Sequence, residues 1–220
     1  MSKLCIIKKT NLLRVGRYMK SSILIDLIAS THLKKLKLII LCILVFLFSN
    51  IFFAISAEII PVYDRGKFGS WKDFDSDCQN TRHELLQTLS LREFTLSENT
   101  CRVLTGLWLD PYTNKYFSDS SELDIDHLVP LKYAWSRGSF GWSKSKLIKF
   151  SNDEKNLFAV KKSVNRQKSA MGPTIWLPPN DNFKCEYIKL FQFIVAKYDL
   201  KQTDDELSQI NIEIEKFCVN

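Results

Sequence analysis

The sequence predicts an α+β domain in residues 58–220, behind an N-terminal export segment. The chain has 220 residues and 45% of them are hydrophobic, which is enough for one domain with its own core. Short segments that suit strands occupy the middle of the chain, and segments with apolar residues at helical spacing dominate its C-terminal third. No internal repeat and no linker rich in Pro, Gly or Ser divides residues 58–220. We therefore expect a single domain there.

Residues 1–57 predict an extension followed by a signal peptide or signal anchor. A basic region around Lys34 precedes the apolar run 38–48, and small residues follow up to Ala57. This order is typical of a secretory signal. Cleavage near Ala57 is one expectation; an uncleaved anchor over residues 38–55 is the alternative, because that stretch reaches the lower edge of a membrane span. In both cases we expect the domain outside the cytoplasm, as a secreted or periplasmic protein or as a membrane-anchored one.

The elements of the first half of the domain follow from caps and alternation. Residues 80–91 predict a helix, because Asn80 or Thr81 suits the N-cap and the leucines that follow share one face. Residues 102–109 alternate loosely and predict a strand that ends in a turn at 110–114. Residues 123–129 alternate Leu, Ile and Leu with Asp, Asp and His, which predicts a second short strand.

The second half of the domain is predicted to be mainly helical. Apolar residues spaced among lysines predict a helix, a loop and a helix in 132–150, and the apolar segment 156–160 predicts a short strand. The polar segment 161–169 predicts a short helix, which Gly172 and Pro173 end. After a rigid turn at 178–180, helical spacing predicts two amphipathic helices, 183–198 and 204–217.

The charge of the chain is distributed unevenly. Residues 1–57 carry nine Lys or Arg and one acid, whereas residues 58–220 carry 22 Lys or Arg and 23 acids. The overall charge of +7 is therefore no argument that the domain binds nucleic acid. Between Lys132 and Lys168, however, ten basic residues face two acids, and aromatic side chains lie among them. This composition suits a surface for a phosphate backbone with little base readout, or alternatively a solvated basic face.

An Asp–His pair at the end of the strand 123–129 is the first candidate for chemistry. On a strand, Asp124 and Asp126 share one face and His127 lies on the other. A carboxylate directly before a histidine could supply a metal ligand and a general base, which phosphodiester hydrolysis needs. By itself the dipeptide more often indicates a half-buried histidine that is hydrogen-bonded to an acid.

Two asparagines change this interpretation. Asn156 follows His127 by 29 residues at the start of a strand, and Asn165 lies nine residues further on, in a helix. Together these residues resemble the HNH endonuclease family, the ββα-metal nucleases. The resemblance implies a ββα-metal core embedded in helices, with Asp126 and Asn165 as metal ligands and His127 as the general base. It implies that Asn156 braces the loop and orients the histidine.

The resemblance extends over roughly residues 61–219. Segments 63–71, 80–86, 110–112, 125–131 and 176–180 are similar, in this order, to a group of small exported bacterial HNH proteins. Each segment alone is a weak signal, but the ordered series is specific.

The cysteines agree with export. The domain holds four cysteines, an even number that suggests two disulfides with three possible connectivities. The family resemblance implies the pairs Cys78–Cys101 and Cys185–Cys218.

The resemblance also implies a cofactor and contacts to the substrate. Asn165 in place of a histidine makes an all-oxygen set of protein ligands, which favours one Mg²⁺ or Mn²⁺ over zinc. Candidate phosphate contacts are Arg166, Lys168, Lys161 and Lys162. Arg82 is a further candidate, with a salt bridge to Glu84 or a neighbouring acid as its alternative role.

A second possible ion site precedes the first helix. Asp73, Asp75 and Asp77 alternate, and Glu84 lies at the twelfth position counted from Asp73, which imitates an EF-hand loop. Cys78 stands at the sixth position, where that loop requires Gly. We therefore expect a polar turn that caps the following helix rather than a degenerate Ca²⁺ site.

These observations predict an exported, metal-dependent, monomeric endonuclease with low sequence specificity. DNA is the favoured substrate and RNA the alternative. His127 would activate water, and one cation would stabilise the leaving 3′-oxygen. The family resemblance implies products with 5′-phosphates. The rival hypothesis is a non-catalytic nucleic-acid-binding or envelope protein that retains the ββα scaffold. We discount it because such a protein would not need the complete set Asp126, His127, Asn156 and Asn165.

Overall fold

The computed structural model describes residues 34–46 and 59–219, which belong to two separate units divided after Ile59. In the first unit, residues 34–46 form a helix with exposed side chains. None of the helices in the described ranges is long and apolar enough to span a bilayer. The predicted cleavage near Ala57 lies outside these residues, and the predicted anchor 38–55 lies only partly within them.

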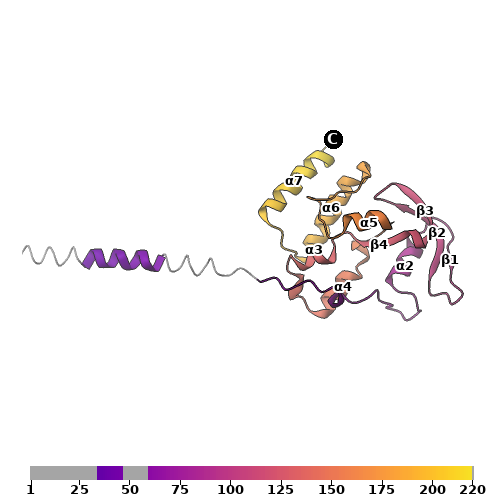
Figure 1. Ribbon diagram of the computed structural model, residues 1–220, viewed down its shortest axis with the longest axis horizontal. Coiled ribbons are helices and arrows are strands. Elements are labelled where there is room, and N and C mark those ends of the chain that lie inside the picture. The colour runs from indigo at the N-terminus through magenta and orange to yellow at the C-terminus, as the bar shows by residue number, and fades with distance from the viewer. Residues whose placement is uncertain (1–33, 47–58, 220) are drawn as a thin grey trace, which may run out of the picture. The chain divides into compact units, whose positions relative to one another are not determined.

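The second unit is a mixed α+β domain, which confirms the predicted fold class (Figure 1). Its helices and strands follow one another in this order: α2 (Thr81–Thr88), β1 (Thr95–Leu96), β2 (Val103–Asp110), β3 (Lys115–Asp119), β4 (Leu123–His127), α3 (Leu131–Trp135), α4 (Lys144–Ser151), β5 (Leu157–Lys161), α5 (Lys162–Lys168), α6 (Asp181–Tyr198) and α7 (Asp204–Cys218).

Most predicted elements are confirmed to within a few residues. The Asn80 side chain caps α2 by accepting a hydrogen bond from Arg82 N, as its position predicted, but α2 ends at Thr88 rather than at residue 91. The strands β1 and β3 were not predicted. β3 is largely exposed along its length and so lacks the alternation that marks a half-buried strand.

The strands form two separate antiparallel sheets. One has the order β1–β2–β3, and the other consists of β4 and β5. In the second sheet Asp126 pairs with Phe158 and His127 with Leu157. The helix α5 begins directly after β5, so β4, β5 and α5 make a unit of two antiparallel strands and a helix.

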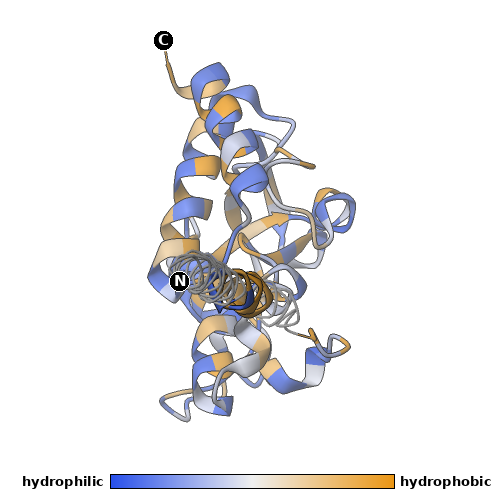
Figure 2. Ribbon diagram, turned by 90° about the vertical axis from the view of Figure 1, so that its left-hand side faces the viewer, coloured by the Kyte–Doolittle hydropathy of each residue, from blue (hydrophilic) through white to orange (hydrophobic). Residues whose placement is uncertain are grey.

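Two hydrophobic clusters support these elements. The larger is built around α6, whose Tyr187, Ile188, Phe191 and Ile194 are fully buried. The smaller packs α2 against the sheets, with Leu86 and Trp108 at its centre. Hydrophobic and hydrophilic residues alternate along the C-terminal helices, as their amphipathic patterns predicted (Figure 2).

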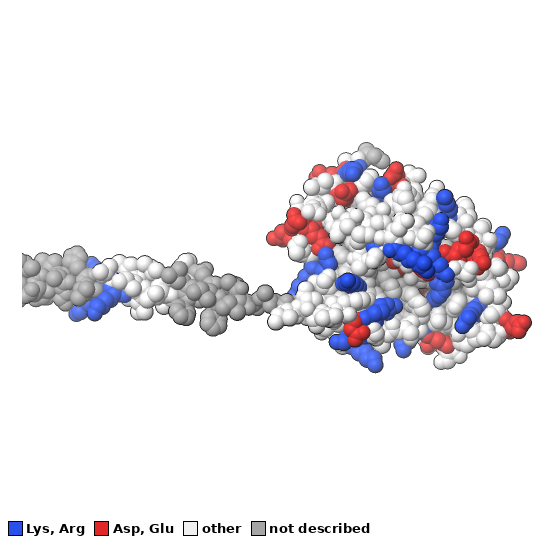
Figure 3. Space-filling view, viewed as in Figure 1, with Lys and Arg blue, Asp and Glu red and all other residues white. Residues whose placement is uncertain are grey.

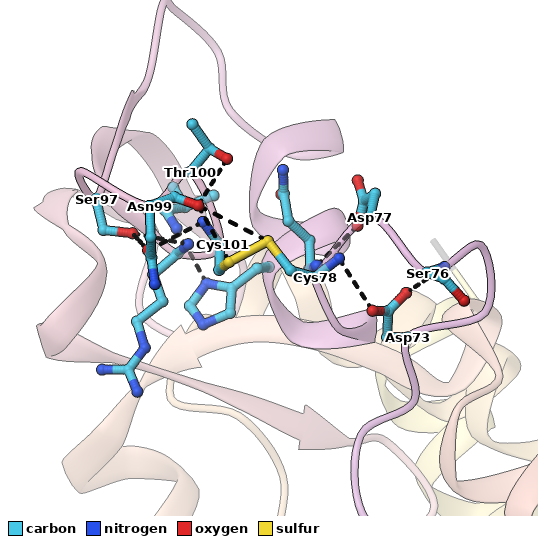
Figure 4. Close-up of a disulfide and its surroundings, with 12 residues drawn as sticks. Asp73, Ser76, Asp77, Cys78, Ser97, Asn99, Thr100 and Cys101 are labelled. Carbon is cyan, nitrogen blue, oxygen red and sulfur yellow. Dashed lines mark hydrogen bonds between the residues drawn. A yellow bond between two sulfur atoms is a disulfide. The ribbon is translucent and has the colours of Figure 1, made fainter.

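Both predicted disulfides are present. Cys78 is bonded to Cys101, and Cys185 to Cys218. The first bond ties the segment before α2 to the start of β2 (Figure 4). The second ties the first turns of α6 to the last residue of α7.

The acidic segment before α2 forms a polar turn. The ligand oxygens of Asp73, Asp75 and Asp77 lie within 4.8 Å of one another. Asp73 accepts hydrogen bonds from the backbone N–H groups of Ser76 and Cys78, and Asp77 accepts one from Gln79 (Figure 4). These carboxylates therefore satisfy the backbone of the turn.

Candidate active site

The Asp–His pair at the end of β4 and Asn165 line one cavity of about 360 Å³. The antiparallel pairing with β5 fixes Asp126 and His127, and α5, which follows β5, supplies Asn165. Polar and charged side chains that line the cavity are Tyr63, Arg65, Asp126, His127, Lys132, Asn165 and Ser169. Three of the four residues named by the family resemblance thus share one cavity.

His127 is held at one ring nitrogen and leaves the other available. Its Nε2 lies 2.8 Å from the carbonyl oxygen of Ser151, and its ring stacks on Trp71 with 5.2 Å between centroids and 9° between planes. A carbonyl oxygen only accepts, so Nε2 carries the hydrogen and Nδ1 keeps its lone pair. Within the described part of the chain, Nδ1 takes part in no hydrogen bond. Burial lowers the pKa of His127 to about 3, which keeps the ring neutral.

Asn156 braces the loop that follows His127. It is fully buried, and its Oδ1 accepts from Val129 N at 2.8 Å while its Nδ2 donates to Val129 O at 3.3 Å. Its backbone carbonyl accepts from Leu128 N. The implied bracing role agrees with this geometry. The implied role in orienting the histidine would be indirect, because the contacts of the His127 ring are to Ser151 and Trp71.

Asp126 is paired with a buried lysine. Lys168 Nζ lies 2.9 Å from Oδ1 and 2.8 Å from Oδ2 of Asp126, and it donates to the carbonyl oxygen of His127 at 2.8 Å. Tyr112 Oη donates to Oδ2 at 2.7 Å. Burial raises the pKa of Asp126, and the ammonium of Lys168 and the Tyr112 hydroxyl oppose that rise.

Lys168 therefore does not have the predicted role of a phosphate contact. Its side chain is 0% exposed, so no substrate phosphate can reach the ammonium in this structure. Val164 and Lys168 lie four residues apart and are the two buried residues of α5. This i, i+4 spacing, which puts both on the inner face of the helix, was the available sequence signal.

Asn165 faces the cavity beside Asp126. Its Nδ2 donates to Asp124 Oδ2 at 3.2 Å, which assigns the amide nitrogen and leaves Oδ1 as the acceptor atom. A carboxylate oxygen and an amide oxygen on one cavity are donors that suit Mg²⁺ or Mn²⁺. The binding of Lys168 shows that Asp126 is arranged to hold a positive charge. The donor set therefore fits the implied divalent cation.

The remaining predicted phosphate contacts differ in their surroundings. Arg82 is half-buried and donates to the carbonyl oxygens of Ser120 and Leu123, so it secures the start of β4 rather than making the alternative salt bridge to Glu84. Arg166 is exposed, whereas Lys161 and Lys162 are half-buried at the junction of β5 and α5.

Two basic residues on the cavity were not predicted, Arg65 and Lys132. Both are exposed. Figure 3 shows Lys and Arg side chains gathered over the region that Figure 1 labels α3, α4 and β4. Arg65 lies in the segment 63–71, which contributed to the family resemblance, but no spacing rule connected it to His127, which follows 62 residues later.

Comparisons with known proteins identify the family. The family described as "GmrSD restriction endonucleases, C-terminal domain" matches residues 75–210. The chain belongs to this family. A protein of Arthroderma benhamiae with the name "Uncharacterized secreted protein" is 35% identical over 152 residues, which are 67% of this chain and 72% of that protein. No solved structure matches the chain at a significant level. Membership in a restriction endonuclease family supports a general nuclease role with nucleic acid as the substrate.

Proposed function

We propose that the chain is an exported, metal-dependent endonuclease of the HNH type, which hydrolyses phosphodiester bonds of DNA, and of RNA as the alternative, with low sequence specificity. The observation that carries the proposal is the placement of His127, held through Nε2 by the Ser151 carbonyl, on the cavity that Asp126 and Asn165 also line. The ββα order of β4, β5 and α5 and the membership in a restriction endonuclease family support it.

His127 is the general base of this mechanism. Its Nδ1 takes the proton from the attacking water while Nε2–H stays bonded to the Ser151 carbonyl. That carbonyl also stabilises the imidazolium that forms, because its dipole points its negative end at Nε2–H. The stack on Trp71 holds the ring plane, so the lone pair of Nδ1 keeps one direction during proton transfer.

Asp126 and Asn165 would hold the divalent cation, with Mg²⁺ or Mn²⁺ as the expected ion. When bound, such a cation supplies Lewis-acid stabilisation of the leaving 3′-oxygen. Cleavage at that bond leaves 5′-phosphate products. Asn156 contributes indirectly, because it fixes the backbone of the loop next to His127.

The substrate is positioned by charge. Arg65 and Lys132 line the cavity, and Arg166 is exposed one residue after Asn165. Cationic side chains around a cleavage site bind the phosphate backbone whatever the base sequence. We expect a domain with these backbone contacts to act as a monomer with little sequence preference.

Export is part of the proposal. The basic and apolar segment before residue 58 is typical of a secretory signal, the domain has two disulfides, and the Arthroderma benhamiae relative is named a secreted protein. We place the domain outside the cytoplasm, either released after cleavage or held by an uncleaved anchor.

The test is cleavage of plasmid DNA and of RNA by the purified, oxidised chain with Mg²⁺, with Mn²⁺ and with EDTA. The expected result is nicking that requires the metal and disappears in His127→Ala. Full activity of His127→Ala would refute the assigned base, and full activity in EDTA would refute the metal requirement. DNA that is retarded on a gel but never cut would instead establish the non-catalytic binding protein.

A further inference from the structure

Lys168 has surroundings that a substrate-binding or solubilising lysine does not have. Its side chain is 0% exposed, and its ammonium is bonded to both carboxylate oxygens of Asp126 and to the His127 carbonyl. Lysine is almost never fully buried without a partner of opposite charge. The positive charge at this position is therefore compensated by Asp126, one of the two proposed metal ligands.

The ammonium takes up the atoms that a metal ion would use. Lys168 lies against both oxygens of the Asp126 carboxylate, and Tyr112 Oη donates to Oδ2, so Oδ1 is the oxygen with an acceptor position left. Asn165, the other proposed ligand, offers only an amide oxygen, which is too little to bind a divalent cation by itself. A cation on Asp126 would therefore lie beside the ammonium of Lys168 and compete with it for the carboxylate.

We propose that Lys168 is a positioning residue that holds Asp126 in place of a divalent cation, and that the cation must displace the ammonium from Asp126 in order to bind. The inference rests on the proposed function in one respect, the assignment of Asp126 as a metal ligand. In this structure Lys168 fixes the position of the buried carboxylate by contacting both of its oxygens. It also sets the affinity of the site, because every bound cation has to replace an existing ion pair.

Metal affinity measured without nucleic acid tests the proposal. Mn²⁺ binding to the full chain is followed by electron paramagnetic resonance for the wild type, Lys168→Met and Lys189→Met. Lys189 is exposed on α6 and serves as the matched control. We expect Lys168→Met to bind Mn²⁺ about tenfold more tightly or better, because removal of the competing charge leaves Asp126 unpaired. Lys189→Met should match the wild type. Equal dissociation constants for Lys168→Met and the wild type, or no binding by either, would overturn the proposal.

A second measurement uses the wild type, since Lys168→Met leaves a buried carboxylate without its partner and could fail to fold. The ¹⁵N resonance of the Lys168 ammonium is assigned by comparison with Lys168→Arg and followed during a titration with Mg²⁺. The expected result is a shift of this resonance that saturates with Mg²⁺ and is absent in Asp126→Asn. A resonance that Mg²⁺ leaves unchanged while the ion binds elsewhere would show a purely structural ion pair and overturn the proposal. Neither readout depends on cleavage. A failed nuclease assay is therefore a separate result from a failure of the cation to displace Lys168.

Discussion

The two histidines of the domain lie in comparable surroundings but differ in which ring nitrogen is hydrogen-bonded. His83 in α2 and His127 at the end of β4 are both partly buried, and burial lowers the pKa of both. Nδ1 of His83 accepts a hydrogen bond from Val103 N at 3.1 Å. In His127 it is Nε2 that is bonded, to Ser151 O, and among the described residues Nδ1 has no hydrogen-bond partner.

This difference separates a structural histidine from the proposed general base. A lowered pKa and partial burial do not distinguish them. His83 uses its acceptor nitrogen to satisfy the backbone of β2, so that nitrogen cannot take a proton from water. His127 uses its donor nitrogen for the hydrogen bond to Ser151 O, and its acceptor nitrogen is the one that the proposed mechanism requires.

The largest expected effect comes from replacing each of the two histidines separately. His127→Ala should reduce kcat for DNA cleavage by about 10²–10⁴-fold, because it removes the general base, and should leave KM nearly unchanged. The matched control His83→Gln, which keeps a side-chain acceptor near Val103 N, should retain kcat. Steady-state cleavage kinetics check both variants. A comparable loss in His83→Gln would erase the distinction between them.

Asn156 fixes the loop that follows His127. Asn156→Ala leaves the buried N–H and C=O of Val129 without partners, which should lower the free energy of unfolding by about 1–3 kcal/mol. Chemical denaturation measures this loss, with Asn182→Ala, an exposed position at the start of α6, as the unaffected control. A loss no larger than that of the control would contradict the bracing role.

The stack on Trp71 is a smaller contribution to the orientation of His127. Trp71→Leu should weaken the alignment of the ring by about 0.5–1.5 kcal/mol, which corresponds to a decrease in kcat of up to about tenfold. Trp71→Phe should retain part of the activity. If Trp71→Leu cuts DNA at the wild-type rate, the Ser151 hydrogen bond alone orients His127.

The smallest effect concerns the segment that carries the Ser151 carbonyl. Asp153 accepts hydrogen bonds from Lys197 and Tyr198 of α6. Burial by itself would raise the pKa of Asp153, but these two hydrogen bonds, the charge of Lys197 and the backbone N–H of Lys155 together lower it. The contribution to stability is thus present above the unfolded pKa of about 3.9 and lost as the pH falls through the lower folded value.

Asp153→Asn should therefore reduce stability by about 0.2–1 kcal/mol at pH 7 and by less at pH values below the folded pKa. Thermal unfolding as a function of pH measures the difference. A difference that is constant over the whole range would show that charge is not its cause.

Much of the fold followed from local patterns. The N-cap Asn80, the alternation of residues 123–129 and the apolar spacing of α6 each acted within a few residues, and the structure agrees with them. The strand β3 was missed because its exposed residues have no periodic burial. β3 forms because it pairs with β2, and its own sequence has no alternation that would predict a strand.

The sequence by itself determined the α+β class and the order of β4, β5 and α5. The family resemblance named Asp126, His127, Asn156 and Asn165 as candidate site residues, and three of them line one cavity in the structure. Caps, periodicities and motif spacings are properties of short segments, so a linear sequence contains them. Tertiary structure alone decided that Ser151 and Trp71 orient His127, and that Lys168 is paired with Asp126 and not exposed to the substrate. Those contacts join segments 24 to 56 residues apart, and chain packing rather than local geometry brings such segments together.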